Sequence, residues 1–139
     1  MAKYTGEILT ACYEYDFSST FAVVVSGDRP NFCGHLLLYT AASGGQYFHI
    51  AERKGFPRHM DEVGYRRYLL ENHKKELRRF PVTISNPTGS NVKVEELVSN
   101  IWRWWVLPHN CASFVEEVVR AGGSSAGLYS NCPALEEFN

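Results

Sequence analysis

The stretch between residues 18 and 52 constrains the fold most, because three short apolar segments follow one another there with turn-forming residues between them. Ser18–Ser26 is rich in β-branched and apolar residues, which indicates a buried strand. His35–Ala42 indicates a second strand, and the alternating segment Gln46–Glu52 indicates a third. A Ser-Gly-Gly turn at residues 43–45 joins the last two segments, so we expect an antiparallel hairpin.

The rest of the chain predicts helices that cover this sheet. An amphipathic helix is expected over Asp61–Phe80, with its lysines and arginines on a solvent-exposed face, followed by a short strand over Phe80–Ile84. A second helix is expected over Val92–Trp105, and a third begins at Asn110, a good N-cap, and ends at the glycine pair 122–123. These elements predict an α+β fold, in which an antiparallel sheet of about four to six strands packs against helices.

Composition restricts the class of protein. Apolar residues make up 45% of the 139 residues, enough for one core, so we expect residues 1–139 to form a single domain. Fourteen lysines and arginines against fifteen aspartates and glutamates argue against nucleic acid as a partner. No apolar run approaches the roughly 20 residues of a bilayer span, and the N-terminus does not resemble a signal peptide. We therefore expect synthesis in the cytoplasm without a signal peptide, and no stable membrane anchor.

The cysteines stand at positions 12, 33, 111 and 132, and no two of them form a Cys-x-x-Cys pair. This spacing argues against a zinc ribbon or a thioredoxin motif. Because a domain of this size does not need cross-links, we expect free thiols, with two disulfides in any of three connectivities as the alternative. The sequence assigns no role to Cys12, Cys33 or Cys132.

Cys111 is the cysteine whose position suggests chemistry. It falls in the first turn of the helix that begins at Asn110. Unpaired N–H groups and the positive end of the helix dipole favour a thiolate there, and the same N–H groups can hold an oxyanion. A buried structural thiol is the alternative.

Two histidines on the predicted hairpin supply what a cysteine nucleophile needs. His35 opens one strand and His49 lies in the next, so one ring can act as base and acid while the second fixes its orientation. Histidines satisfied within the core are the alternative. The hypothesis therefore names Cys111, His35 and His49 as catalytic residues.

The order of these motifs resembles that of the circularly permuted NlpC/P60 (papain-like) hydrolases, which include the lecithin-retinol acyltransferase-like proteins. The shared motifs are Gly-His-Leu-Leu-Leu-Tyr at residues 34–39, Tyr-Phe-His-Ile-Ala at 47–51 and Asn-Cys-Ala-Ser-Phe-Val at 110–115. The resemblance implies a permuted papain-like architecture without metal or cofactor. It also implies that Cys111 is the nucleophile, His35 the general base and acid, and His49 the orienting residue.

The resemblance further implies a cysteine amidase or peptidase that works through an acyl-enzyme intermediate. It points to bacterial peptidoglycan peptides as substrate and to a secreted antibacterial toxin, such as a type VI secretion effector, acting in the periplasm of a target cell. A cognate immunity protein would then be its partner.

Other activities with the same Cys-His-His site are phospholipase or acyltransferase activity and a deSUMOylase-type peptidase. A non-catalytic interaction module on the same scaffold is a further alternative. Ala112-Ser113 replaces the Glu-His that follows Asn-Cys in the lipid-acting members, which weakens the lipid alternative. Trp102, Trp104 and Trp105 are the only candidates for an apolar entrance, and the sequence assigns them no role.

The hypothesis sets a condition on the hairpin register. His35 lies directly opposite His49 only if the turn is centred on Ala42. A tight turn at Gly44-Gly45 would separate the two rings by about 16 Å along the strand. We therefore expect a loop built from residues 41–43 with Gly44 in a left-handed conformation, or a bulge. Both rings should face Cys111, with a nitrogen of His35 about 3 to 4 Å from its sulfur and His49 beyond that ring.

Overall fold

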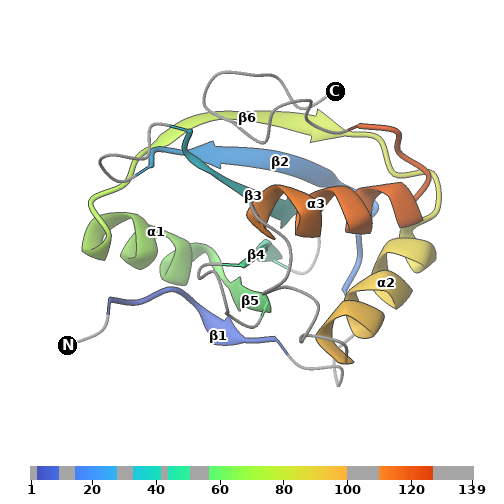
Figure 1. Cartoon of the computed structure of the whole chain (residues 1–139), viewed down its shortest axis with the longest axis horizontal. Coiled ribbons are helices and arrows are strands. Elements are labelled where there is room, and N and C mark those ends of the chain that lie inside the picture. The colour runs from blue at the N-terminus through green and yellow to red at the C-terminus, as the bar shows by residue number, and fades with distance from the viewer. Residues whose placement is uncertain are drawn as a thin grey trace.

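In the computed structural model the described residues are 3–9, 15–27, 33–41, 44–50, 57–99 and 110–126, and of residues 99 and 110–113 only the backbone is described. Six strands and three helices lie within these ranges (Figure 1). In chain order they are β1 (Glu7–Ile8), β2 (Thr20–Val25), β3 (His35–Thr40), β4 (Gln46–Ile50), β5 (Pro57–Met60), α1 (Glu62–Glu71), β6 (Glu76–Val82), α2 (Pro87–Ser99) and α3 (Asn110–Ala121).

The six strands form one sheet in the order β1-β5-β4-β3-β2-β6. Each of its strand pairings is antiparallel. This arrangement confirms the predicted α+β class with an antiparallel sheet packed against helices. The three strands expected from the apolar segments are confirmed as β2, β3 and β4, and the predicted hairpin joins β3 to β4.

Both faces of the central strands are buried, because a helix packs on each. One face packs against α3 and α2, and its core includes Ala22, Val24, Leu36, Leu38, Phe48, Phe114, Val115, Val118 and Val119. The other face packs against α1, and its core includes Val23, Val25, Leu37, Tyr47, Met60, Tyr65 and Tyr68. Successive side chains of a strand point to opposite faces, which explains why β2 and β3 read as continuous apolar runs.

The helix predicted over Asp61–Phe80 is wrong in its second half. α1 ends at Glu71, where the side chain of Asn72 donates a hydrogen bond to the carbonyl of Tyr68 over 2.9 Å. His73 then adopts a left-handed conformation with φ of 53°, which turns the chain back. β6 follows and pairs along the whole of β2. Pairing with the open edge of β2 outweighs the helix propensity of the residues beyond 75.

α2 begins at Pro87, five residues earlier than predicted. Proline is suited to the first position of a helix, and the Asn86 side chain accepts a hydrogen bond from Gly89 N over 3.1 Å. The part of this prediction that holds Trp102, Trp104 and Trp105 lies outside the described residues.

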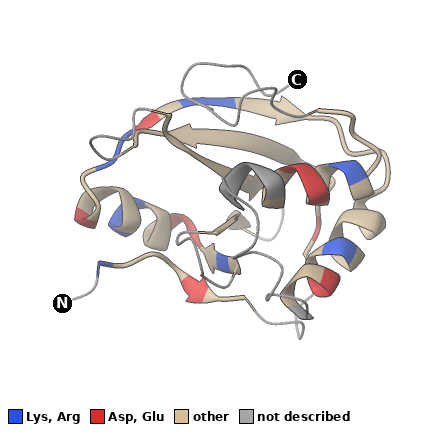
Figure 2. Cartoon of the chain, in the orientation of Figure 1, with Lys and Arg blue, Asp and Glu red and all other residues tan. Residues whose placement is uncertain are grey.

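α3 has the predicted start at Asn110 and is followed by the predicted glycine pair, with Gly123 at a φ of 92°. Lys93 of α2 forms ion pairs with Glu96 and with Glu117 of α3, so charges of both signs are interspersed on these two helices (Figure 2).

The packing of α3 predicts which apolar side chain matters most for stability. Phe114 is fully buried between α3 and the sheet. We expect Phe114→Ala to lower the free energy of unfolding by about 3–5 kcal/mol, since it removes apolar burial and leaves a cavity. The control is Val63→Ala on α1, where 78% of the side chain is exposed and the change should stay below about 0.5 kcal/mol. Urea unfolding of both variants tests this, and equal effects would contradict the assigned core.

Candidate active site

The hairpin register brings His35 and His49 to the same face of the sheet. β3 and β4 pair Leu38 with Phe48, so Leu37 lies opposite His49 and His35 lies two residues further along. The prediction that the two histidines lie directly opposite each other is therefore wrong. They are diagonal neighbours on one face, a spacing of about 7–8 Å between Cα atoms that long side chains can bridge.

The loop between the strands has neither of the two predicted centres. It is centred on residue 43, one position beyond Ala42 and short of a tight Gly44-Gly45 turn. Gly44 and Gly45 have φ values of 84° and 90°, so the left-handed conformation expected for Gly44 is confirmed. Two consecutive positive φ angles favour glycine, which is why this loop can close at this length.

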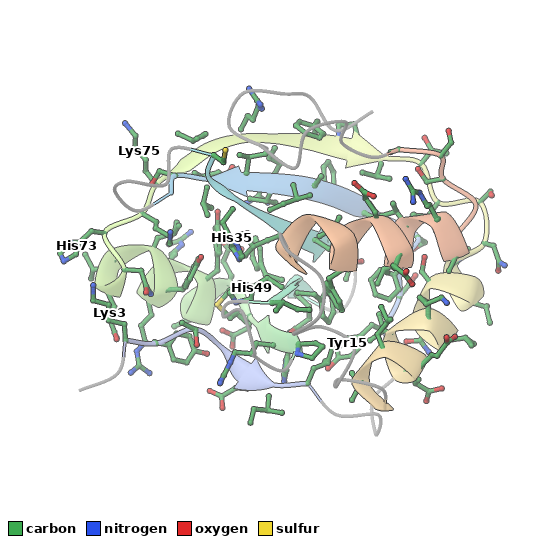
Figure 3. All side chains as sticks on the ribbon, viewed as in Figure 1. Lys3, Tyr15, His35, His49, His73 and Lys75 are labelled. Atoms are coloured by element: carbon green, nitrogen blue, oxygen red, sulfur yellow. The ribbon has the colours of Figure 1, made fainter. Side chains whose placement is uncertain are left out.

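The two imidazole rings form a hydrogen bond. Nε2 of His35 lies 2.9 Å from Nδ1 of His49, and the rings meet edge to face at a centroid distance of 5.1 Å (Figure 3). His49 is fully buried, whereas His35, as the first residue of β3, is partly exposed at the end of the sheet. The expectation that these two residues come together is thus confirmed.

A backbone carbonyl completes the chain of hydrogen bonds. Nε2 of His49 lies 2.8 Å from the carbonyl oxygen of Thr5. Because a carbonyl oxygen can only accept, Nε2 of His49 must carry the proton. In the neutral ring Nδ1 is then an acceptor, so Nε2–H of His35 donates to it. This leaves Nδ1 of His35 with a lone pair and no proton, the form that a general base requires.

Burial keeps both rings neutral. The pKa of His49 is lowered to about 4, mainly by burial and also by the positive charges of Arg58 and Lys74, while the bond to Thr5 acts in the opposite direction. Burial, followed by the effects of His49 and Lys74, holds the pKa of His35 well below its usual range. Near pH 7 the pair is therefore uncharged.

The rings project from the face of the sheet that carries α1. His35 pairs with Val25, which belongs to the core under α1, and His49 meets the ring of Tyr68 in α1 edge to face at 5.1 Å. The expectation that both rings lie on the face that carries α3, the helix whose first turn contains Cys111, is therefore wrong. In β3 the residues at even positions pack against α3, and the histidines follow the odd positions.

The first turn of α3 nevertheless lies toward the end of the sheet where β3 begins. The other end of α3 is fixed near the end of β6, because Asn86 N donates to the carbonyl of Gly122 over 2.8 Å. From there the helix extends back over the sheet (Figure 1). The predicted contact between the Cys111 sulfur and His35 lies outside the described residues.

Cys33 corrects the expectation of free thiols, because it is part of a disulfide. Its partner lies outside the described side chains. Cys33 stands two residues before His35, separated from it by Gly34 at a φ of 76°. The cross-link therefore anchors the chain where it enters β3. Cysteine number and domain size carried no information on which side chains the fold brings together.

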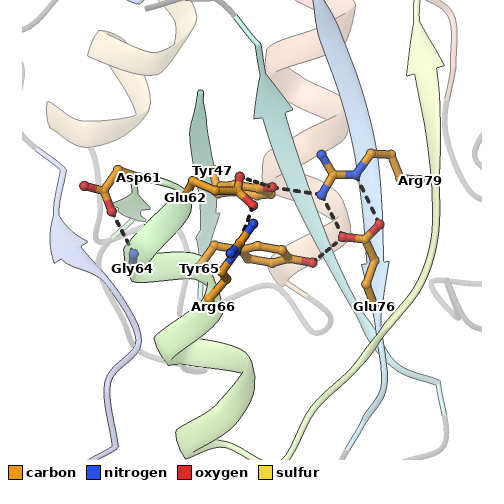
Figure 4. Close-up of polar contacts among 8 residues, drawn as sticks. All are labelled: Tyr47, Asp61, Glu62, Gly64, Tyr65, Arg66, Glu76 and Arg79. Carbon is orange, nitrogen blue, oxygen red and sulfur yellow. Dashed lines mark hydrogen bonds and ion pairs between the residues drawn. The ribbon is translucent and has the colours of Figure 1, made fainter. Parts of the chain in front are cut away.

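A second polar network lies on the same face as the histidines (Figure 4). The Tyr47 hydroxyl donates to Glu62 over 2.8 Å and accepts from Arg79 over 2.8 Å. Arg79 and the Tyr65 hydroxyl both donate to Glu76 over 2.7 Å, and the rings of Tyr47 and Tyr65 stack at 3.9 Å. The network joins β4, α1 and β6, two residues from His49. Sequence reasoning placed Arg79 on a solvated helix face and so missed it.

No protein-family model, curated protein or solved structure matches this chain. Among the side chains that the structure describes, no group of three His, Cys, Asp or Glu residues lies close enough to hold a metal ion. Within the same ranges, no helix combines the length and apolar character needed to cross a bilayer.

The neutral state of His49 predicts a pH dependence of stability. The pKa is about 4 in the folded protein and about 6.5 in the unfolded chain, so the unfolded chain binds more protons between these values. His49 makes its full contribution to the free energy of unfolding above pH 6.5. This contribution falls by about 3 kcal/mol as the pH drops toward 4. Urea unfolding between pH 4 and 7 should show that the free energy of unfolding depends less on pH for His49→Asn than for the wild type. The contributions of the carboxylates are common to both proteins and cancel in this comparison. Parallel curves for the two proteins would contradict a neutral buried ring.

Proposed function

We propose that the protein is a cysteine hydrolase that cleaves an amide or peptide bond through an acyl-enzyme intermediate. Cys111 is the nucleophile, His35 the general base and acid, and His49 the orienting residue. The observation that supports this most is the hydrogen-bond chain from His35 through His49 to Thr5, which leaves Nδ1 of His35 unprotonated. The start of α3 at Asn110 adds a helix N-terminus on the side of Cys111.

The proposed reaction has two steps. As the Cys111 sulfur attacks the substrate carbonyl carbon, Nδ1 of His35 takes the thiol proton. Free N–H groups in the first turn of α3 stabilise the oxyanion, and His35 gives the proton to the leaving amine, so that a thioester forms. Water then attacks the thioester, with His35 as base and then as acid, and the acid product and the thiol are released. Because His35 is the first residue of its strand, Cys111 approaches its ring from beyond the beginning of β3.

We propose peptidoglycan peptides as the substrate, on the resemblance to the permuted NlpC/P60 hydrolases. The disulfide at Cys33 supports a site of action outside the cytoplasm, because disulfides form and persist in compartments such as the bacterial periplasm. A secreted antibacterial toxin, with a type VI system as its route and an immunity protein as its partner, fits such a compartment.

Phospholipase or acyltransferase activity is the second candidate, and one observation favours it. Val63 and Leu70 stand seven residues apart on the outer side of α1, and each side chain is 78% exposed. Residues at this spacing share one helix face, which could rest on a lipid surface. The same Cys111 and His35 would then attack an ester.

Hydrolysis assays separate the two candidates. We expect the wild-type protein to release fragments from purified peptidoglycan, measured by mass spectrometry, and not to cleave phosphatidylcholine vesicles. Cys111→Ala should lower the rate by roughly a thousandfold or more, because the nucleophile is lost. Ser113→Ala, in the same helical turn, is the control and should retain activity. Release of fatty acid that depends on Cys111 would support the lipid candidate, and no Cys111-dependent hydrolysis of either substrate would overturn the proposal.

Thiol labelling gives an independent prediction. Without reducing agent at neutral pH, iodoacetamide should modify Cys111 before any other cysteine, because the helix N-terminus stabilises its thiolate. Cys33 should be modified only after reduction, since it is in a disulfide. Peptide mapping by mass spectrometry identifies both. A map that joins Cys111 to Cys33 would exclude Cys111 as a resting nucleophile.

A further inference from the structure

The backbone around Thr5 is held in place from both sides by side chains. The amide of Tyr4 donates to Oε1 of Glu71 over 2.9 Å, and the amide nitrogen of the Asn72 side chain donates to the carbonyl of Tyr4 over 2.8 Å. On the other side, Nη1 of Arg58 donates to the carbonyl of Gly6 over 2.9 Å. Three backbone groups that flank the Thr5 carbonyl thus have fixed partners at the end of α1 and in β5.

Gly6 allows this segment to approach β5. Its φ is 104°, and a Cβ added there would lie 2.9 Å from the carbonyl oxygen of His59 and 2.9 Å from the side chain of Met60. Any other residue would be strained in this conformation and would push the segment away. The next two residues pair with β5 as strand β1, so the Thr5 carbonyl lies where an edge strand begins.

The chemistry of this acceptor differs from that of a carboxylate. A carbonyl fixes the proton on Nε2 of His49 but brings no negative charge, so it orients the ring without stabilising a charged imidazolium. Arg58 and Lys74, which face His49 from β5 and from the segment after α1, add positive charge instead. The orientation of the His49 ring therefore depends on the position of the Thr5 carbonyl.

We infer that the Thr5 carbonyl is the third member of a histidine relay, the hydrogen-bond chain that runs from His35 through His49. Glu71 and Asn72 are then positioning residues that hold this carbonyl against His49. The inference rests on the proposed function, in which His35 is the base. Glu71 and Asn72 reach His49 through the amide and the carbonyl of Tyr4, and Asn72 also donates to the carbonyl of Tyr68, whose ring contacts His49. Displacement of this segment would let the protons of both rings move to the other nitrogens and remove the lone pair at Nδ1 of His35.

The test compares matched variants at the end of α1. Asn72→Ala and Glu71→Ala each remove one bond to Tyr4, whereas Glu71→Gln keeps an acceptor for the Tyr4 amide. Leu70→Ala, whose side chain is 78% exposed, is the control. Long-range proton–nitrogen NMR correlations of ¹⁵N-labelled histidine report the His49 tautomer at pH 7. The ratio kcat/KM on peptidoglycan peptides, as a function of pH, reports the base.

We expect wild type, Leu70→Ala and Glu71→Gln to show His49 with its proton on Nε2. The double variant Glu71→Ala/Asn72→Ala should show a mixture of tautomers, and its kcat/KM should fall about tenfold or more. The single variants carry the same comparison where the double variant does not fold. A folded double variant with the wild-type tautomer and pH profile would overturn the inference. A change of tautomer in a protein without Cys111-dependent hydrolysis would support the positioning role and overturn the proposed function.

Discussion

The hydrogen bond from His49 to the carbonyl of Thr5 is the interaction on which the site depends, because it sets the direction of every donor that follows. Nε2 of His49 donates to the carbonyl, so its Nδ1 accepts from His35. Neither ring carries a charge near neutral pH, which spares the fold the penalty of burying an unpaired ion. A buried polar chain of this kind is stable only when each member has a partner, and here a main-chain atom is the last one.

The arrangement of helices explains why the chain needs both faces of its sheet. α3 covers one face with an apolar stripe. On the other face, Tyr65 of α1 and Tyr47 of β4 form hydrogen bonds with glutamate and arginine partners. The histidines lie on the face that carries α1, where buried polar groups have hydrogen-bond partners. The ring nitrogens of His49 likewise have partners there, in His35 and the Thr5 carbonyl. His35 is the first residue of β3. A side chain from the α3 layer can therefore reach its ring by passing the beginning of this strand.

Prediction from the sequence succeeded where a local pattern decided the outcome. The apolar runs of β2 and β3 and the glycines after α3 have strong local signals. The contact between His35 and His49 was expected only as a condition of the catalytic hypothesis, and the two residues meet diagonally and not directly opposite each other. The end of α1 was missed because residues beyond 75 suit a helix as well as a strand, and only the open edge of β2 decides. Thr5 left no signal at all, since any residue has a carbonyl. The disulfide at Cys33 depends on distant proximity that spacing does not encode.

The diagonal register of the hairpin ties the two imidazoles to the pairing of the strands and not to the length of the loop. Side chains alternate along a strand, so a slip of β4 against β3 by two residues would still leave both rings on one face. A slip by one residue would turn His49 through the sheet to the apolar side beneath α3, where Phe48 now packs. The loop can therefore lengthen without moving the rings, provided that Leu38 stays opposite Phe48.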